Sequence, residues 1–238
     1  MRSRIAEAIR MTGQPVAVLL ANEAPEGALR FVGDRWGCVM SMLSAASKGR
    51  EAAFDKDTCG CSGGKVGLGF ETFQLGFIDR FLSTGTETVQ GEYHRQSPEI
   101  ARTFIEALPL VELAHPFVVF EPLDRLASED TPEVVVFLAT PDQLSGLATL
   151  ASYDRPGREN VIFAAASGCQ ATVLLALDQG RSPEPKCLLG LTDPAARRFV
   201  DPNVLSFAIP WQRFLEMERN VDESFLGRET WARLAKRF

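Results

Sequence analysis

Residues 160–190 read NVIFAAASGCQATVLLALDQGRSPEPKCLLG, and their pattern indicates the fold class. The apolar run over 160–166 predicts a strand, the segment from Cys169 to about residue 179 predicts a helix, and residues 188–191 predict a second strand. Strands that alternate with helices are typical of α/β proteins. We therefore expect an α/β fold in which helices pack against a mixed sheet.

The same alternation extends over the rest of the 238 residues, and we expect residues 1–238 to form a single compact unit. The valine-rich run 134–139 is typical of a strand that is buried on both faces. An amphipathic tail, mostly helical, is expected over 211–238. The other expected strands cover 15–21 and 116–122, the other expected helices cover 2–12, 38–48, 73–83, 98–108 and 141–152, and a glycine-rich loop is expected over 58–69.

The cysteine pattern of this stretch has a counterpart earlier in the chain. Trp36-Gly37-Cys38 opens a helix-like segment that ends at Gly49-Arg50, as Ser167-Gly168-Cys169 opens one that ends at Gly180-Arg181. The interval from the cysteine to the closing glycine is 11 residues in both blocks. The agreement predicts an internal repeat over 13–70 and 131–195, with two pseudo-symmetric halves packed as one unit; chance agreement of common dipeptides is the alternative.

Each block also ends in a second cysteine, three residues before a glycine. Cys61 precedes Gly64 in the run Cys59-Gly60-Cys61-Ser62-Gly63-Gly64, and Cys187 precedes Gly190. All five cysteines therefore lie inside the two blocks. Cys59 has no counterpart in the second block.

Composition limits the classes of function that the chain can have. The net charge of −6 gives no basic surface for nucleic acid or for an anionic membrane. The apolar runs are too short to span a bilayer, and residues 1–10 lack the apolar run of a signal peptide. We therefore expect a cytoplasmic protein, in which cysteines serve metal binding, redox chemistry or simple burial rather than disulfides.

The positions of the cysteines favour a metal or iron–sulfur site. Cys38 and Cys169 stand at helix N-termini, where unpaired N–H groups and the helix dipole stabilise a thiolate. Four thiolates match a [4Fe–4S] cluster or a four-cysteine zinc site. We expect Cys38, Cys61, Cys169 and Cys187 as ligands, with Cys59 as the alternative to Cys61 or as an additional ligand. Separate buried cysteines and a thiol redox pair are the competing interpretations.

Other residue patterns give weaker signals. The run from Ser62 to Gly69 does not match the glycine patterns of phosphate-binding loops. His94 and His115 are interpreted as a surface and a structural histidine. Arg50 and Arg181 follow the glycines that end the two block helices, where such residues cap helix carbonyls more often than they bind an anionic substrate.

The residues of the cysteine blocks and of the C-terminal third resemble a known family. The segments that carry the resemblance are Gly37-Cys38, residues 59–69, Ser167-Gly168-Cys169, the run GLTDPAAR at 190–197, LSFAIP at 205–210 and ESFL at 223–226. They are similar to the uncharacterised bacterial and archaeal family named domain of unknown function 169. The resemblance covers most of the chain and implies a single unit, but it implies no activity.

The leading expectation is an iron–sulfur protein with a redox or electron-transfer role; if it is an enzyme, we expect an iron–sulfur oxidoreductase. Its partner would be a redox protein or a small-molecule substrate, without nucleic acid or membrane, and a homodimer stays open. The alternatives are a non-catalytic module that senses a metal or a redox state, and a module with zinc or no metal that binds a small metabolite.

Overall fold

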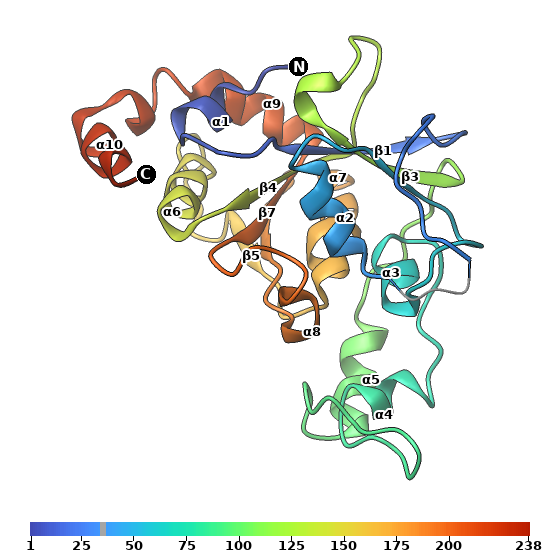
Figure 1. Ribbon diagram of the computed structural model, residues 1–238. Helices are drawn as coiled ribbons and strands as arrows, with labels where there is room; N and C mark the ends of the chain where they lie inside the picture. Colours follow the sequence, from blue (N-terminus) through green and yellow to red (C-terminus); the bar gives the residue numbers. More distant parts are fainter. Residues whose placement is uncertain (34–36) are drawn as a thin grey trace.

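The computed structural model describes residues 1–33 and 37–238, which form one seven-stranded mixed sheet with helices on both of its faces (Figure 1). The predicted α/β class is confirmed. Across the sheet the strand order is β2-β3-β1-β4-β7-β6-β5. The strands are β1 (Val16–Ala21), β2 (Ala52–Phe54), β3 (Phe117–Pro122), β4 (Val134–Ala139), β5 (Val161–Phe163), β6 (Cys187–Gly190) and β7 (Leu205–Pro210).

The helices occur near most of the predicted positions but are shorter at several of them. The glycine-rich segment 58–69, predicted as a loop, contains α3, so that prediction is wrong in part. A π-helical turn, η2 (Gln170–Leu174), leads directly into α7. The helices are α1 (Arg4–Ala8), α2 (Val39–Ala46), α3 (Ser62–Gly67), α4 (Ile78–Phe81), α5 (Pro98–Glu106), α6 (Pro141–Leu150), α7 (Leu175–Gly180), α8 (Pro194–Arg197), α9 (Trp211–Asn220) and α10 (Glu229–Leu234), with short 3₁₀ turns at Leu123–Arg125, Phe225–Gly227 and Ala235–Arg237.

Alternate residues of the central strands pack into two separate apolar layers. In β4, Val134 and Val136 pack in the layer that holds α2, η2 and α7, whereas Val135 and Phe137 pack in the layer that holds α1, α6, α9 and α10. Successive side chains of a strand point to opposite faces, so one continuous valine run serves both layers. The predicted burial of this strand on both faces is confirmed.

The cysteine turns of the predicted repeat differ between its two parts. The order of the strands is alike in the two parts, because β3 lies between β2 and β1 as β7 lies between β6 and β4. The cysteines are placed differently: Cys61 caps the N-terminus of α3, whereas Cys187 is the first residue of β6. The described residues therefore give no pseudo-symmetric halves that include the cysteine turns, and the internal repeat of 13–70 and 131–195 stays a prediction.

Residues 70–113 form a small lobe that carries α4 and α5 and projects away from the sheet (Figure 1). Within this lobe the carboxylate of Asp79 is fully buried and accepts hydrogen bonds from Arg102 Nη2 at 2.9 Å and from the Gly76 N–H at 2.8 Å. A buried charge with both partners in place fixes α4 against α5. The lobe is also linked to the body of the protein, because Arg95 Nη2 donates a hydrogen bond to the carbonyl oxygen of Ala165 at 2.8 Å.

The C-terminal tail is mostly helical, as predicted. Hydrogen bonds to this tail hold the N-terminal residues in place. Glu218 of α9 accepts hydrogen bonds from Ser3 Oγ at 2.5 Å and from the Arg4 N–H at 2.9 Å. The bond from the Arg4 N–H, and another from the Ile5 N–H at 3.3 Å, satisfy N–H groups at the start of α1 that have no partner within their own helix. Within the described ranges, no helix combines the length and the apolar character needed to cross a membrane.

Candidate functional site

Helix α3 packs closely against the start of α2 and the start of η2, because two of its residues at these contacts are glycines. A β-carbon at Gly64 would lie 2.8 Å from Val39 Cγ2, and one at Gly67 would lie 2.3 Å from Cys169 Cβ. Both distances are shorter than real side chains tolerate. The glycines therefore allow a close approach between three segments that lie far apart in the sequence.

Gly168 lets the segment before η2 approach α2 and α8 closely. A β-carbon there would lie 3.1 Å from Met40 Cγ of α2 and 3.0 Å from Ala196 Cβ of α8. The starts of α2, α3 and η2 thus pack against one another on one face of the sheet. We call this place the three-helix junction.

Four of the five cysteines lie at the three-helix junction, at the positions where its helices begin. Cys38 is the N-cap of α2, Cys61 is the N-cap of α3, Cys59 lies two residues earlier, and Cys169 directly precedes η2. Cys38, Cys59 and Cys169 are buried and Cys61 is half-buried. All four thiols are free. The structure therefore places at one junction Cys38, Cys61 and Cys169 of the expected ligands, together with Cys59, which was expected as the alternative to Cys61 or as an additional ligand.

The four thiols act on one another electrostatically. Burial raises the pKa of Cys169 well above its usual value, and negative charge on Cys61, Cys38 or Cys59 raises it further. Burial also raises the pKa of Cys59 to about 11; a main-chain hydrogen bond at Cys61 opposes this rise, and negative charge on the Cys61 thiol adds to it. In the absence of a cation, these neighbours therefore keep the buried thiols protonated.

Hydrogen bonds at the start of α3 hold the two cysteines of this segment in place. The Gly64 N–H donates to Cys61 Sγ at 3.3 Å, and the Cys59 thiol donates to the carbonyl oxygen of Cys61 at 3.7 Å.

The carboxylate of Asp193 also lies near this site, and the sequence analysis assigned it no role. Its oxygens accept hydrogen bonds from the Ala195 N–H at 2.9 Å and from the Gly168 N–H at 3.4 Å. Burial is the main cause of the raised pKa of Cys38 and of Cys169, and the charge of Asp193 adds to the rise in both. The pair Asp193-Pro194 at the start of α8 is a sequence signal for an N-cap, but it does not indicate the neighbouring cysteines.

Gln170, directly after Cys169, carries a buried polar atom without a hydrogen-bond partner. Its Oε1 accepts from the Ser167 N–H at 3.1 Å, whereas its Nε2 has no partner in the part of the chain that the structure describes. Buried donors of this kind cost free energy unless a ligand or a water satisfies them. In residues 1–33 and 37–238, no three His, Cys, Asp or Glu side chains are already gathered as a metal ion would require.

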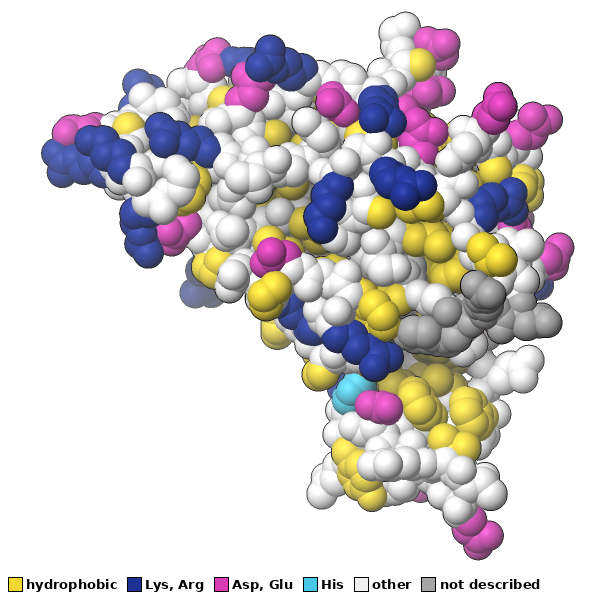
Figure 2. Space-filling model, viewed as in Figure 1, with side chains coloured by type: hydrophobic (Ala, Val, Ile, Leu, Met, Phe, Trp, Pro, Cys, Tyr) yellow, Lys and Arg dark blue, Asp and Glu magenta, His cyan; other side chains and the backbone are white. Residues whose placement is uncertain are grey.

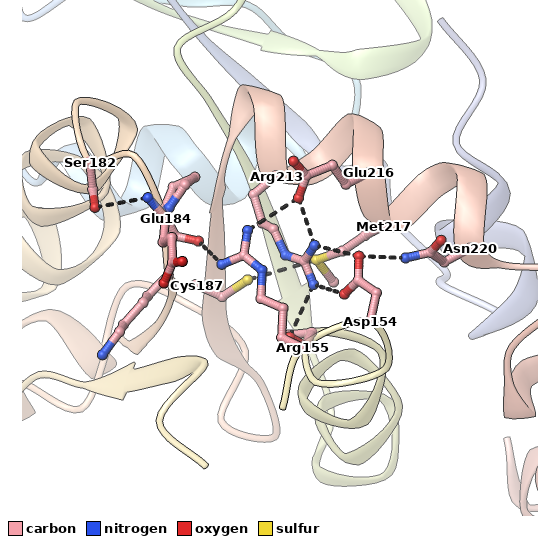
Figure 3. Close-up of polar contacts among 12 residues, drawn as sticks. Asp154, Arg155, Ser182, Glu184, Cys187, Arg213, Glu216, Met217 and Asn220 are labelled. Atoms are coloured by element: carbon pink, nitrogen blue, oxygen red, sulfur yellow. Dashed lines mark hydrogen bonds and ion pairs between the residues drawn. The ribbon is translucent and has the colours of Figure 1, made fainter. Parts of the chain in front are cut away.

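Cys187 lies on the opposite face of the sheet, so its predicted place in a shared site is corrected. It is buried in the layer of α9, with its sulfur 3.7 Å from Met217 Sδ (Figure 3). Burial raises its pKa to about 12, and the charges of Arg213 and Arg155 oppose this rise. A group held by Cys38 and Cys169 cannot include Cys187, because β6 stands between them and its side chain.

The residues beside Cys187 form a structural ion-pair network. Arg213 is 1% exposed and donates to Asp154 Oδ1 at 2.5 Å, Asp154 Oδ2 at 2.9 Å and Glu216 Oε2 at 2.7 Å (Figure 3). The hydrogen bonds from Arg213 lower the pKa of Asp154 to about 2. The ordinary value of this carboxyl is 3.8, so its contribution to stability is complete above about pH 4 and is lost as the pH falls towards 2.

We expect Asp154→Asn to lower the free energy of unfolding by about 1 to 3 kcal/mol at pH 7, because it weakens charge-assisted hydrogen bonds to a buried guanidinium. The difference in the free energy of unfolding between the variant and the unchanged protein should be smaller at pH 3. The native Asp154 carboxylate contributes less stability there than at pH 7. Urea unfolding at both pH values measures it, with Glu229→Gln in an exposed ion pair as the control that changes little. An equal difference at pH 7 and pH 3 would contradict this assignment.

The remaining predicted residues lie outside the three-helix junction. His115 Nδ1 shares a hydrogen bond with Asn22 Oδ1 at 2.9 Å, and the carbonyl oxygen of His94 accepts from Arg95. Arg181 Nη2 donates to the carbonyl oxygen of Glu112 at 2.7 Å. The main-chain N–H of Arg50 donates to Ala45 at the end of α2. Trp36 of the first block lies outside the described residues.

Comparisons with known proteins identify the family and leave its activity open. A family model described as uncharacterised ArCR matches residues 4–220, which is nearly the whole chain. Neither the curated proteins nor the solved structures contain a match. The match over nearly the full length shows that this chain belongs to the uncharacterised family named domain of unknown function 169.

Proposed function

We propose that this protein binds an iron–sulfur cluster through Cys38, Cys59, Cys61 and Cys169, and that the cluster serves a redox or electron-transfer role. The observation that carries the proposal is that four free thiols from three chain segments lie at the three-helix junction, near enough for charge on Cys38, Cys59 or Cys61 to act on Cys169. Compared with the ligand set expected from the sequence, Cys59 takes the place of Cys187.

The negative charges that the junction can carry favour the binding of cations. Four thiolates and the carboxylate of Asp193 would place five negative charges in a largely buried volume, and the charge of Lys65 acts on Cys59 against them. Buried anions are costly without compensating cations. Iron ions would supply that compensation, since a coordinated thiol loses its proton.

The residues around the thiols suit a cluster as well. The Gly64 N–H already points at Cys61 Sγ, and the unpartnered Nε2 of Gln170 offers a second donor one residue from Cys169. Hydrogen bonds to sulfur are one of the means by which proteins set the potential of a cluster. Loading would draw the four thiols closer together than they lie in this structure. When bound, such a cluster would supply one-electron transfer.

The proposed role requires that the protein works in the cytoplasm, where thiols stay reduced. The partner is a redox protein or a small-molecule substrate that exchanges electrons with the cluster. If the protein catalyses a reaction, the same site makes it an iron–sulfur oxidoreductase.

Purification without oxygen, followed by iron, sulfide and zinc analysis, tests the proposal. We expect iron and acid-labile sulfide in a fixed ratio to protein, and visible absorption that bleaches on reduction. Stoichiometric zinc without iron would replace the proposal by a zinc-stabilised binding module. A colourless protein without iron, after loading with iron and sulfide under reducing conditions, would contradict it.

A further inference from the structure

A cavity of about 590 Å³ lies between the body of the protein and the lobe of residues 70–113. Val66 of α3 and Leu174 of η2 line it from the body, and Leu75 and Leu110 line it from the lobe. Its volume lies in the range of sites that bind small organic molecules. It is separate from the thiol site, because its lining includes none of the cysteines.

The cavity leaves large apolar side chains in contact with water. Leu110 is 76% exposed and Leu75 is 45% exposed, although both border the cavity. Figure 2 shows apolar side chains gathered on the lobe that carries α4 and α5. An apolar molecule in the cavity would remove such surface from water, which is the main source of affinity in sites of this kind.

The charged residues of the lining decide which head group the molecule carries. Glu71, Glu106 and Glu112 line the cavity together with one guanidinium, that of Arg181, which the carbonyl oxygen of Glu112 holds at 2.7 Å. Because carboxylates outnumber the guanidinium among these lining residues, their field in the cavity attracts cations and repels anions.

We propose that this cavity binds a small amphiphile with an apolar chain and an ammonium head group. The chain lies against Val66, Leu174 and the two exposed leucines, and the head group lies at the glutamates of the opening. The proposal stands on the cavity alone, so it holds whether or not the thiols bind a cluster.

Calorimetric titration of the full chain with octylammonium, octanoate and octanol tests the proposal. We expect octylammonium to bind at least about tenfold more tightly than octanoate, with octanol between them. Glu106→Gln combined with Glu112→Gln should reduce the preference for the cation. Octanoate affinity equal to or above that of octylammonium would overturn the proposal, as would the lack of octylammonium binding.

A matched pair of variants locates the binding. Leu110→Lys places a cation at the opening of the cavity, and we expect it to weaken octylammonium binding at least about tenfold. Phe163→Lys changes another exposed apolar side chain, on β5 and outside the cavity lining, and should leave the affinity unchanged. Equal affinities for the two variants would overturn the assignment to this cavity. Cys169→Ser should bind octylammonium normally, which separates this test from that of the thiol site.

Discussion

Cys169→Ser protein purified without oxygen is expected to contain at least about tenfold less iron than the unchanged protein, with the fold retained. Cys169 is the one thiol that the second half of the chain supplies to the three-helix junction, 131 positions after Cys38. A serine hydroxyl is a poor substitute for a thiolate on iron. Iron analysis and the circular dichroism spectrum measure the two parts of the prediction.

Cys187→Ala is the matched control for this variant. Cys187 is buried, like Cys169, but it contacts Met217 on the other face of the sheet. Its removal should lower stability by a small amount and leave the iron content unchanged. Iron retained in folded Cys169→Ser, or lost from folded Cys187→Ala, would contradict the placement of the site.

Gly67→Ala is expected to lower the free energy of unfolding by about 3 kcal/mol, because the junction has no room for a methyl group at this position. The new β-carbon would lie 2.3 Å from Cys169 Cβ and 2.9 Å from the main-chain nitrogen of Gln170. The main chain of η2 cannot turn away as a flexible side chain would. Urea unfolding followed by circular dichroism measures the loss.

Gly63→Ala, in the same helix, is the control for Gly67→Ala. Within the described residues outside its own helix, a β-carbon at Gly63 meets only Cys61 Sγ, at 4.0 Å, which is an ordinary contact. Alanine also favours a helix over glycine by up to about 1 kcal/mol, so this variant should be neutral or slightly more stable. Equal losses in the two variants would show that glycine flexibility, rather than close packing at Gly67, explains the result.

The sequence predicts the elements of this fold well, since strand and helix periodicity reflect burial that the chain encodes locally. It could not predict which face of the sheet receives each cysteine. In β6, Leu188 packs in the layer of the thiols, whereas Cys187, one residue earlier, packs in the opposite layer. A shift of one residue reverses the face, so matching the spacing of two cysteine motifs does not establish that they share a site.

Two further features of the site depend on tertiary packing. The glycines of 58–69 favour a loop by intrinsic propensity, yet Gly64 and Gly67 form a helix because their small size lets α3 pack against α2 and η2. Asp193 reaches the thiols through the N-cap of α8, and its partner Gly168 is 25 positions away in the chain. Neither contact leaves a periodic signal in the sequence.

A crystal structure of the anoxically loaded protein, with anomalous diffraction measured at the iron absorption edge, tests whether Cys38, Cys59, Cys61 and Cys169 hold one iron–sulfur group at the three-helix junction. We predict one iron peak enclosed by the starts of α2, α3 and η2, with these four sulfurs as its ligands. Iron bound beside Cys187, or loaded crystals in which the four thiols carry no iron, would contradict this assignment.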